Sequence, residues 1–379
     1  MKNKVLAYSY LFQEMFLSKD IFLIPYYISK EKGLKLEYRY HVNLGDTNIP
    51  HVHREARINK SCLGNEFLSL LWYVVLHAWV IEVLFLNGSS AKHMLTVGLY
   101  KMLHPQGKII VFGDMERPLA EELNQKDFVY SRGLSGWIKG KLTDFFFSHV
   151  TYIVANTEAY EIMRELCDRK GWNGLSHFYP CLDDELFHEY GLKRIPFHEK
   201  ENIMLCVGRI GNHQKNTEML LHALEQVDLK EWKIYMIGPI TSSFDLKEGG
   251  DFQRVIDDFF ERCPQDKDKL IFTGMIYDMK EIFMYYNRAK VLLSTARHEG
   301  FANVYSQAAA LGCYVISTDV GGADVGSNQW EFGTKIEQED SEGLAHVLTD
   351  LVEGRLVMDE SKSVPLREMC YSERIKELL

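Results

Sequence analysis

The sequence lacks the patterns that mark disulfide-linked, metal-binding and secreted proteins. Its seven cysteines are an odd number, with no CxxC pair and no metal-ligand spacing, which is typical of thiols kept reduced in a cytosol. The apolar run after Met1 is short, includes Glu14 and has no small-residue cleavage site, so a signal peptide is not indicated. We therefore expect a cytoplasmic protein without a disulfide framework.

An excess of positive charge is also absent. The formal net charge is -10, which argues against nucleic acid as a partner, because such binders need clustered Lys and Arg to displace counterions from phosphates. The sequence contains no internal repeat and no low-complexity segment. Its 379 residues, 46% hydrophobic and 25% charged, have an ordinary globular composition and favour two domains.

One stretch of the sequence has the length and apolar character of a membrane-spanning helix. Residues 67–86 are apolar over about the ~20 residues that a bilayer requires, but His77 and Glu82 interrupt the run. We expect instead a buried helix through Trp79 that leads into a core strand, because fully buried parallel strands are continuous apolar runs. A membrane-spanning helix is the minor alternative.

Strand-like runs alternate with helical patterns along the whole chain, which is typical of parallel sheets with crossover helices. A polar, proline-containing stretch at 191–201 separates two series of strands and is interpreted as a linker. We therefore expect an α/β protein with two facing Rossmann-like domains, 1–195 and 196–379, and a ligand cleft at the carboxyl ends of both sheets; the last helix is the segment that could pack back on the first domain. The expected strands are 4–10, 34–42, 80–88, 107–114 and 151–156 in the first domain, and 202–210, 233–238, 270–274, 290–296 and 313–319 in the second.

Two segments of the second half carry the chemistry. In VGRIGNHQKNTEMLLHAL, residues 207–224, a strand ends and a loop brings Arg209 and Lys215 toward a helix; two fixed cations there suit a diphosphate. In residues 294–322, Glu299, Gly300 and Phe301 lie where a loop turns into a helix, so free backbone N–H groups and the positive helix end form an anion or hydroxyl site. The turn 319–322 ends the next strand at the same edge. For Arg209 or Lys215 taken singly, a solvated surface charge on a loop is the more common explanation.

These segments resemble the donor-binding domain of retaining glycosyltransferases of the GT-B type, the glycosyl transferases group 1, which include many bacterial capsule and lipopolysaccharide enzymes. The resemblance covers residues 203–350. It implies that Arg209 and Lys215 bind the diphosphate and that Glu299, the first glutamate of the family's paired-glutamate motif, contacts the donor sugar. The implied donor-binding set also includes Gly208, Gly300, Phe301, Ala302, Asn303 and Gln307.

The chain departs from the family pattern in two places. The family's second glutamate, which holds the ribose hydroxyls, is here Gln307, and an amide offers one acceptor and one donor where a carboxylate offers only acceptors. The Gly-rich loop after the first strand is missing. Ser18 or Asp20 could supply a ligand-binding helix terminus in its place, although we interpret them as plain N-caps.

Other polar groups follow strand ends in the first half. Asp114 is assigned a catalytic role toward the acceptor by its position, whereas His93 is interpreted as structural or solvated. His51 and His53 lack metal-spaced partners and are interpreted as surface residues. No DxD signature ends a strand of the donor domain, so no metal is indicated.

Residues 132–150 combine Arg132, Lys139 and Lys141 with Trp137 and three consecutive phenylalanines. We interpret them as a core-facing helix with a solvated face. Peripheral contact with anionic lipid on the inner face of a membrane is the open alternative.

The sequence thus predicts a hexosyl- or deoxyhexosyltransferase that moves a sugar from a UDP-, GDP- or dTDP-sugar to a hydroxyl of a glycan or lipid-linked glycan, with retention and without a cofactor or metal. The implied pathway is synthesis of bacterial surface polysaccharide or glycoconjugate. Two alternatives remain: a catalytically weak GT-B subunit that stabilises a partner transferase, and, ranked lower, a nucleotide-sugar 2-epimerase.

Overall fold

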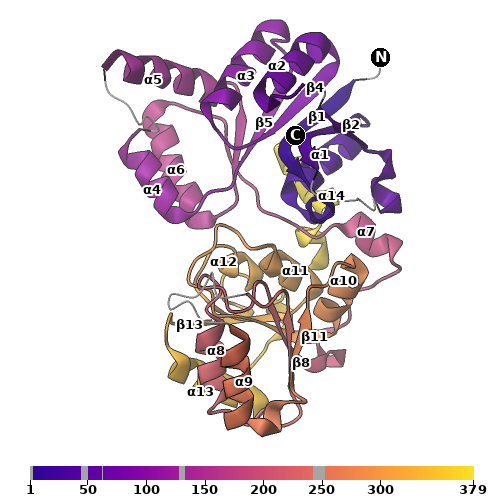
Figure 1. Cartoon of the computed structure of the whole chain (residues 1–379), viewed down its shortest axis with the longest axis vertical. Coiled ribbons are helices and arrows are strands. Elements are labelled where there is room, and N and C mark those ends of the chain that lie inside the picture. Colours follow the sequence, from indigo (N-terminus) through magenta and orange to yellow (C-terminus); the bar gives the residue numbers. More distant parts are fainter. Residues whose placement is uncertain (1–2, 44–49, 62, 128–132, 242–251) are drawn as a thin grey trace. The chain divides into compact units, whose positions relative to one another are not determined.

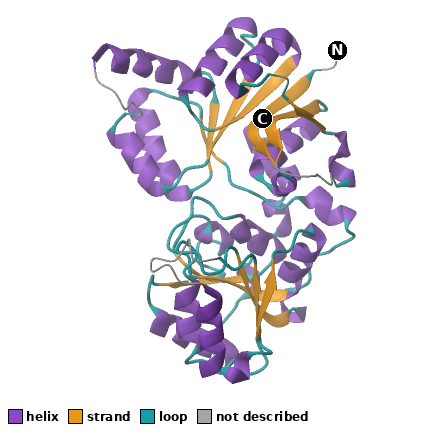
Figure 2. Ribbon diagram, viewed as in Figure 1, coloured by secondary structure: helices purple, strands orange, loops and turns teal. Residues whose placement is uncertain are grey.

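The computed structural model describes residues 3–43, 50–61, 63–127, 133–241 and 252–379. These residues form two compact units (Figure 1): unit 1 comprises Met1–Glu189 and Tyr371–Leu379, and unit 2 comprises Tyr190–Cys370. In each unit the strands form a central sheet with helices on both of its faces (Figure 2). The predicted α/β class and the pair of Rossmann-like domains are therefore confirmed.

Unit 1 is built on a seven-stranded parallel sheet with the order β3-β2-β1-β4-β5-β6-β7. Its strands are β1 (Lys4–Phe12), β2 (Lys35–Asn43), β3 (Arg57–Lys60), β4 (Ile81–Asn87), β5 (Lys108–Gly113), β6 (Thr151–Val154) and β7 (Leu175–His177). Its helices are α1 (Asp20–Glu31), α2 (Glu66–His77), α3 (Ala91–Leu103), α4 (Arg117–Gln125), α5 (Gly133–Phe147), α6 (Thr157–Lys170), α7 (Asp184–Glu189) and α14 (Tyr371–Arg374). Short 3-10 turns are η1 (Glu14–Ser18), η2 (His51–Glu55), η3 (Ala78–Val80) and η9 (Ile375–Leu378).

The helices α2 to α6 cover one face of this sheet. They share a single apolar core with side chains of β1, β4, β5 and β6, in which Leu84 and Val111 of the strands are fully buried. The central strands are buried on both faces, as the continuous apolar runs of β4 and β5 predict. Strand β1 pairs with β2 on one side and with β4 on the other. Its Val5 lies opposite Leu36 of β2 and Val83 of β4.

The last residues of the chain belong to unit 1. The Tyr371 hydroxyl donates to Asp20 Oδ1 at 2.9 Å, and the Ser372 N–H donates to Asp184 Oδ1 at 3.1 Å. The ring of Tyr371 is buried and stacks on Tyr27, with ring centroids 5.2 Å apart. Two aspartates from distant parts of the chain therefore hold the C-terminal segment in place.

Unit 2 is built on a six-stranded parallel sheet with the order β10-β9-β8-β11-β12-β13. Its strands are β8 (Glu201–Val207), β9 (Lys233–Ile237), β10 (Leu270–Gly274), β11 (Ala289–Ser294), β12 (Tyr314–Thr318) and β13 (Gly333–Ile336). Its helices are α8 (Thr217–Leu224), α9 (Phe252–Arg262), α10 (Met279–Arg288), α11 (Asn303–Leu311), α12 (Ala323–Gly326) and α13 (Ser341–Val352), with 3-10 turns η4 (Phe197–Glu199), η6 (Pro264–Asp266), η7 (Glu360–Lys362) and η8 (Leu366–Met369). The strand order reverses between β8 and β11, and ligands of such sheets bind beside that reversal.

All ten predicted strands are present, but β3, β7 and β13 were not predicted. Each of these strands is short and carries few apolar residues: RINK, LSH and GTKI. All three lie at the edges of their sheets. Edge strands need little apolar surface and are commonly short and charged, so no hydrophobic run marked them.

The expectation of a buried helix through Trp79 is wrong. Helix α2 buries Leu70, Tyr73 and Val74 against the sheet, but its other side is open to solvent and Trp79 is 74% exposed. The predicted core strand that follows, β4, is correct. Within the described residues, no helix combines the length and the apolarity needed to cross a bilayer.

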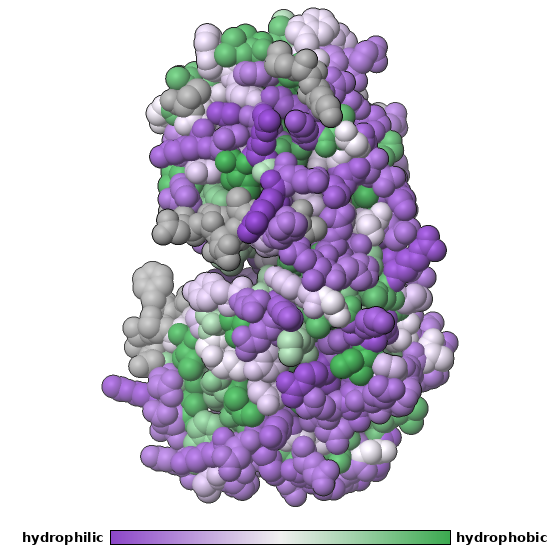
Figure 3. All heavy atoms as spheres, turned by 90° about the vertical axis from the view of Figure 1, so that its right-hand side faces the viewer, coloured by the Kyte–Doolittle hydropathy of each residue, from purple (hydrophilic) through white to green (hydrophobic). Residues whose placement is uncertain are grey.

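Hydrophilic residues predominate on the face of the molecule shown in Figure 3, with apolar residues in smaller groups among them. The six cysteines in the described ranges are all buried, and no disulfide joins any two of them.

Candidate active site

The loop between β8 and α8 carries the two cations predicted to bind a diphosphate. Gly208 and Arg209 follow the end of β8, and Lys215 precedes the start of α8. Gly208 has a φ of 154°, and a Cβ there would come within 2.9 Å of the Lys215 Cε. The glycine therefore leaves the room that the Lys215 side chain needs to cross the end of the strand.

The loop between β11 and α11 brings Glu299 to the same place. The Lys215 Nζ donates to Glu299 Oε1, and the two side chains are only 20% and 11% exposed. Buried Thr295 fixes the two loops against each other, because its hydroxyl contacts the backbone oxygens of Lys215 at 3.1 Å and Asn216 at 2.8 Å. The structure thus brings together the predicted residues Arg209, Lys215 and Glu299 at the carboxyl edge of the sheet.

Gln214 joins these charged groups and was not predicted from the sequence. Its amide oxygen accepts from Arg209 Nη2 at 2.7 Å, and its amide nitrogen donates to the His298 backbone oxygen at 3.0 Å and to Glu299 Oε2 at 3.2 Å. An amide can serve a cation and a carboxylate together because it has both an acceptor and donors. Only its position beside Lys215 could have suggested this role.

Helix α11 begins at the predicted anion site. Its N-cap is Ala302, and among the described residues no side chain caps its first N–H groups. The Ala302 N–H donates to the Gly321 oxygen at 3.3 Å, which joins the helix start to the turn after β12. The first turn of α11 therefore presents backbone donors and the positive end of the helix dipole beside Glu299.

Gly322 lets this turn approach the helix closely. Its φ is 93°, and a Cβ there would lie 3.1 Å from the ring of Tyr305 and 3.3 Å from the ring of Phe301. The buried Tyr305 hydroxyl bonds to Ser294 at 3.1 Å and to Ser317 at 2.8 Å, at the ends of β11 and β12. Burial raises the pKa of Tyr305 to about 12, so it stays neutral and fixes the helix on the sheet.

Gln307 lies one turn further along α11. It is partly exposed, and its side-chain amide forms no hydrogen bond within the part of the chain that the structure describes. Asn303, at the start of the helix, is also partly exposed, and its side-chain amide likewise forms no hydrogen bond with the described residues. Both are therefore available to polar groups of a ligand.

Gly208, Arg209 and Lys215 line one small pocket together with Ser294 and Thr295. The pocket lies where β8 and β11 end, beside the reversal of strand order. Apolar side chains such as Leu220 and Met236 complete its lining, and its cations and hydroxyl groups are the ones that suit the phosphates of a nucleotide.

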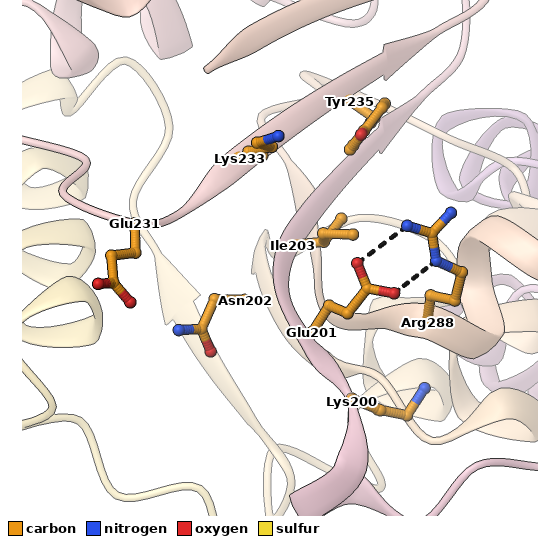
Figure 4. Close-up of a pocket in the computed structure, with 8 residues that line it drawn as sticks. All are labelled: Lys200, Glu201, Asn202, Ile203, Glu231, Lys233, Tyr235 and Arg288. Atoms are coloured by element: carbon orange, nitrogen blue, oxygen red, sulfur yellow. Dashed lines mark hydrogen bonds and ion pairs between the residues drawn. The ribbon is translucent and has the colours of Figure 1, made fainter. Parts of the chain in front are cut away.

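A second pocket lies at the opposite, amino-terminal edge of the same sheet (Figure 4). Its cations are largely occupied: Arg288 forms two hydrogen bonds with Glu201, at 2.6 and 2.9 Å, and the buried Lys200 Nζ donates to two backbone oxygens of α10. Lys233 also lines this pocket. This pocket lies away from the reversed strand ends and from the start of α11, so it offers a matched control for the first one.

Asp114 belongs to unit 1, where it follows β5 and is exposed. Its charge contributes to the raised pKa of Asp20, which burial brings to about 6. His93 is half-buried on α3, with its Nδ1 3.3 Å from the Ser90 hydroxyl, and burial lowers its pKa. Asp114 and Asp20 are therefore near enough for their charges to interact.

Two interpretations from the sequence are wrong in unit 1. Ser18 and Asp20 do not cap α1: its N-cap is Lys19, the Ser18 hydroxyl donates to the Met15 oxygen at 2.9 Å, and Asp20 accepts from Tyr371. His53 is not a surface residue.

His53 is 1% exposed, and its Nε2 lies 2.9 Å from Asp183 Oδ2. Asp183 also accepts from the Tyr27 hydroxyl at 2.6 Å. Asp183 lies far from His53 in the sequence, so no local spacing of residues could predict this pair. His51 is exposed as expected.

Comparison with known families agrees with this geometry. Residues 201–354, which contain both loops of the candidate site, match the model of the family "Glycosyl transferases group 1". Comparison of the whole sequence with those of curated proteins found no match.

Solved structures similar to this chain share the GT-B fold over its whole length. HepE from Anabaena, solved with UDP and glucose, has a TM-score of 0.59 at 12% identity, with 100% of this chain and 95% of that chain covered. The lipopolysaccharide outer core galactosyltransferase WaaB has a TM-score of 0.62 at 12% identity, with 99% and 97% covered. A trehalose-phosphate synthase from Burkholderia xenovorans, solved with glucose-6-phosphate, has a TM-score of 0.62 at 12% identity, with 99% and 98% covered. At these identities the likeness establishes the fold.

Proposed function

We propose that this chain, a GT-B protein with a glycosyl transferases group 1 region in its C-terminal unit, transfers a sugar from a nucleoside diphosphate sugar to a hydroxyl group. The observation that supports this proposal best is the grouping of Arg209, Lys215 and Glu299 beside the start of α11. Two cations, one carboxylate and uncapped helix N–H groups are what a diphosphate with an attached sugar requires.

Arg209, Lys215 and the start of α11 hold the diphosphate in this proposal. Negative charge grows on the diphosphate as the bond to the sugar breaks, and fixed positive groups stabilise that charge without reorganising. Glu299 accepts a hydrogen bond from a hydroxyl of the sugar and keeps Lys215 in place through their ion pair. The chain's main contribution is therefore positioning and electrostatic stabilisation.

Transfer proceeds with retention in this proposal. The departing diphosphate oxygen takes the proton of the acceptor hydroxyl on the face from which it leaves, so no protein base at the donor site is needed. Asp114 in unit 1 orients the acceptor, which we take to be a glycan or lipid-linked glycan of a bacterial surface polysaccharide. Similar proteins solved with UDP and glucose or with glucose-6-phosphate support a hexosyl donor and a sugar acceptor.

A catalytically weak subunit that stabilises a partner transferase is the second candidate, and Gln307 favours it. At this position a carboxylate could accept hydrogen bonds from two ribose hydroxyls, whereas an amide has a single acceptor oxygen. The intact group of Arg209, Lys215 and Glu299 favours the active enzyme.

A panel of UDP-, GDP- and dTDP-sugars tests both candidates. A donor that binds only the folded chain raises its melting temperature, and turnover then releases the nucleoside diphosphate, which can be assayed directly. We expect one nucleotide class to stabilise the chain and to be consumed in the presence of a hydroxyl acceptor. Binding without turnover for every donor and acceptor would favour the weak subunit, and no binding at all would refute the proposed transfer.

A further inference from the structure

The helices α2, α3 and α5 carry an unusual number of exposed apolar side chains on their outer surface. We call this surface the apolar layer. Its members are Leu68, Trp72, Val75, Leu76, Trp79, Leu95, Met102, Trp137, Ile138 and Phe145, which are 37–80% exposed.

Helix α2 has two apolar sides. Leu70, Tyr73 and Val74 are buried in the core, while Leu68, Trp72, Val75, Leu76 and, in η3, Trp79 are 46–74% exposed. The exposed set is spaced i, i+4, i+7, i+8 and i+11, which places it along a single stripe of the helix. The sequence has no charged residue between Glu66 and Glu82, so this stripe has no ionised group within it.

The other two helices continue the layer. Helix α3 lies beside α2 and α5 lies beside α3 (Figure 1). Phe146 and Phe147 of α5 are buried in the same core as the inner sides of α2 and α3, as predicted for this helix. All three helices therefore cover one face of the sheet, and their outer sides form a common surface.

Scattered exposed apolar residues are normal, but a grouped set indicates a contact surface. More than half of the large apolar side chains that are exposed in the described residues belong to the apolar layer. It also contains Trp72, Trp79 and Trp137, which are half of the six tryptophans of the chain. Tryptophan is enriched where a protein meets a membrane surface, because its ring is apolar and its N–H is polar.

The charges of the layer distinguish a lipid from a protein partner. Lys92, Lys139 and Lys141 are exposed and form no ion pair within the described residues, while the acids of these helices, Glu66 and Asp144, are partly buried. Among the described residues of these three helices, every exposed ionised side chain is therefore a cation, on a chain with a net charge of -10. Protein interfaces are depleted in lysine, whereas an anionic lipid surface attracts it.

We propose that the apolar layer docks unit 1 on an anionic lipid surface, with its tryptophans and leucines among the acyl chains and Lys92, Lys139 and Lys141 at the headgroups. This contact is peripheral, with the helices lying in the plane of the interface. Arg132, at the start of the predicted basic stretch, lies outside the described residues. The proposal does not depend on the proposed sugar transfer, since vesicle binding is measured without any donor.

Flotation of the full chain with vesicles tests the docking. We expect binding to equimolar phosphatidylcholine and phosphatidylglycerol, and at least about tenfold weaker binding to phosphatidylcholine alone. The triple variant Trp72→Ser/Leu76→Ser/Trp79→Ser should lose about tenfold or more in affinity for the anionic vesicles. The triple variant Lys92→Gln/Lys139→Gln/Lys141→Gln should lose the preference for anionic lipid and most of the salt dependence.

Control variants change equally exposed residues elsewhere. Tyr277→Ser/Val357→Ser, at side chains 81% and 82% exposed in unit 2, and Lys267→Gln should bind vesicles like the wild type. Unchanged melting temperatures show that the variants fold.

The docking is wrong if wild type and both triple variants bind vesicles equally, or if none binds at low salt. It is also wrong if the wild type forms a dimer and does not bind vesicles, while the apolar triple variant is a monomer. In that case the apolar layer contacts a second copy of the chain.

Discussion

Replacing Glu299 by Gln separates the two roles that we assign to this carboxylate. In the structure Glu299 is paired with Lys215 and accepts from Gln214. The variant keeps the shape of the side chain but removes its negative charge. Two unit charges about 4 Å apart interact by ~1 kcal/mol in water and by ~4 kcal/mol at an effective dielectric of 20.

The Lys215 and Glu299 side chains are 20% and 11% exposed, so their surroundings lie between these two dielectric limits. We therefore take about 1–2 kcal/mol for the repulsion between Glu299 and a bound diphosphate. Glu299→Gln should therefore bind bare UDP, GDP or dTDP about 5- to 30-fold more tightly. Transfer should fall, since a hydrogen bond from the sugar to a charged acceptor contributes about 1.5–3 kcal/mol, or about 10- to 150-fold in rate.

Calorimetric titration with the three nucleoside diphosphates, together with turnover of the matching sugars, measures both effects. A melting curve checks that loss of the ion pair has not unfolded unit 2. Weaker diphosphate binding with unchanged turnover would refute the assignment of Glu299 to the sugar and of Lys215 to the phosphates.

Four further outcomes are expected. Arg209→Ala and Lys215→Ala should each weaken diphosphate binding by about 1.5–3 kcal/mol without unfolding the chain; unchanged affinities in calorimetry would discard the site. Transfer should persist after thorough chelation, and complete loss with EDTA that Mg²⁺ or Mn²⁺ restores would reveal a metal requirement. Gln307→Glu should strengthen binding of UDP or GDP relative to dTDP, whose sugar lacks the 2′-hydroxyl, because a carboxylate accepts from both ribose hydroxyls; if the ratio of affinities does not change, Gln307 is not at the ribose. Burial raises the pKa of Asp20 to about 6 from a usual 3.8, so the folded chain binds more protons than the unfolded chain between these values. Its free energy of unfolding should then fall by about 1–3 kcal/mol as the pH rises from 4 through 6; denaturant melts of Asp20→Asn should lack this part of the pH dependence, and parallel curves would contradict it.

The central strands and the donor loops could be predicted because their signals are local. Buried parallel strands such as β4, β8 and β11 are continuous apolar runs. The order of charged residues and glycine around Arg209 and Glu299 places them at strand ends, and parallel strands end at one edge of a sheet.

Features that depend on distant partners could not be predicted. His53 is buried because the rings of Phe22 and Tyr26 pack against it and Asp183 lies 2.9 Å from its Nε2, and nothing near His53 in the sequence indicates these contacts. The outer side of α2 was expected to be buried because apolar periodicity alone does not distinguish a core from an exposed stripe. The role of Gln214 depends on contacts with Arg209 on its own loop and with Glu299 on a distant loop, so the sequence did not indicate it.

Titration of nucleoside diphosphates into paired variants tests the donor site most directly. The double variant Arg209→Ala/Lys215→Ala removes both cations at the carboxyl edge of the sheet in unit 2, and Lys233→Ala/Arg288→Ala removes two cations at its amino-terminal edge (Figure 4). We predict that the first variant loses nearly all affinity for the diphosphate that binds the wild type, while the second binds it like the wild type. Equal binding by both variants, or loss only in the second, would contradict the placement of the donor beside α11.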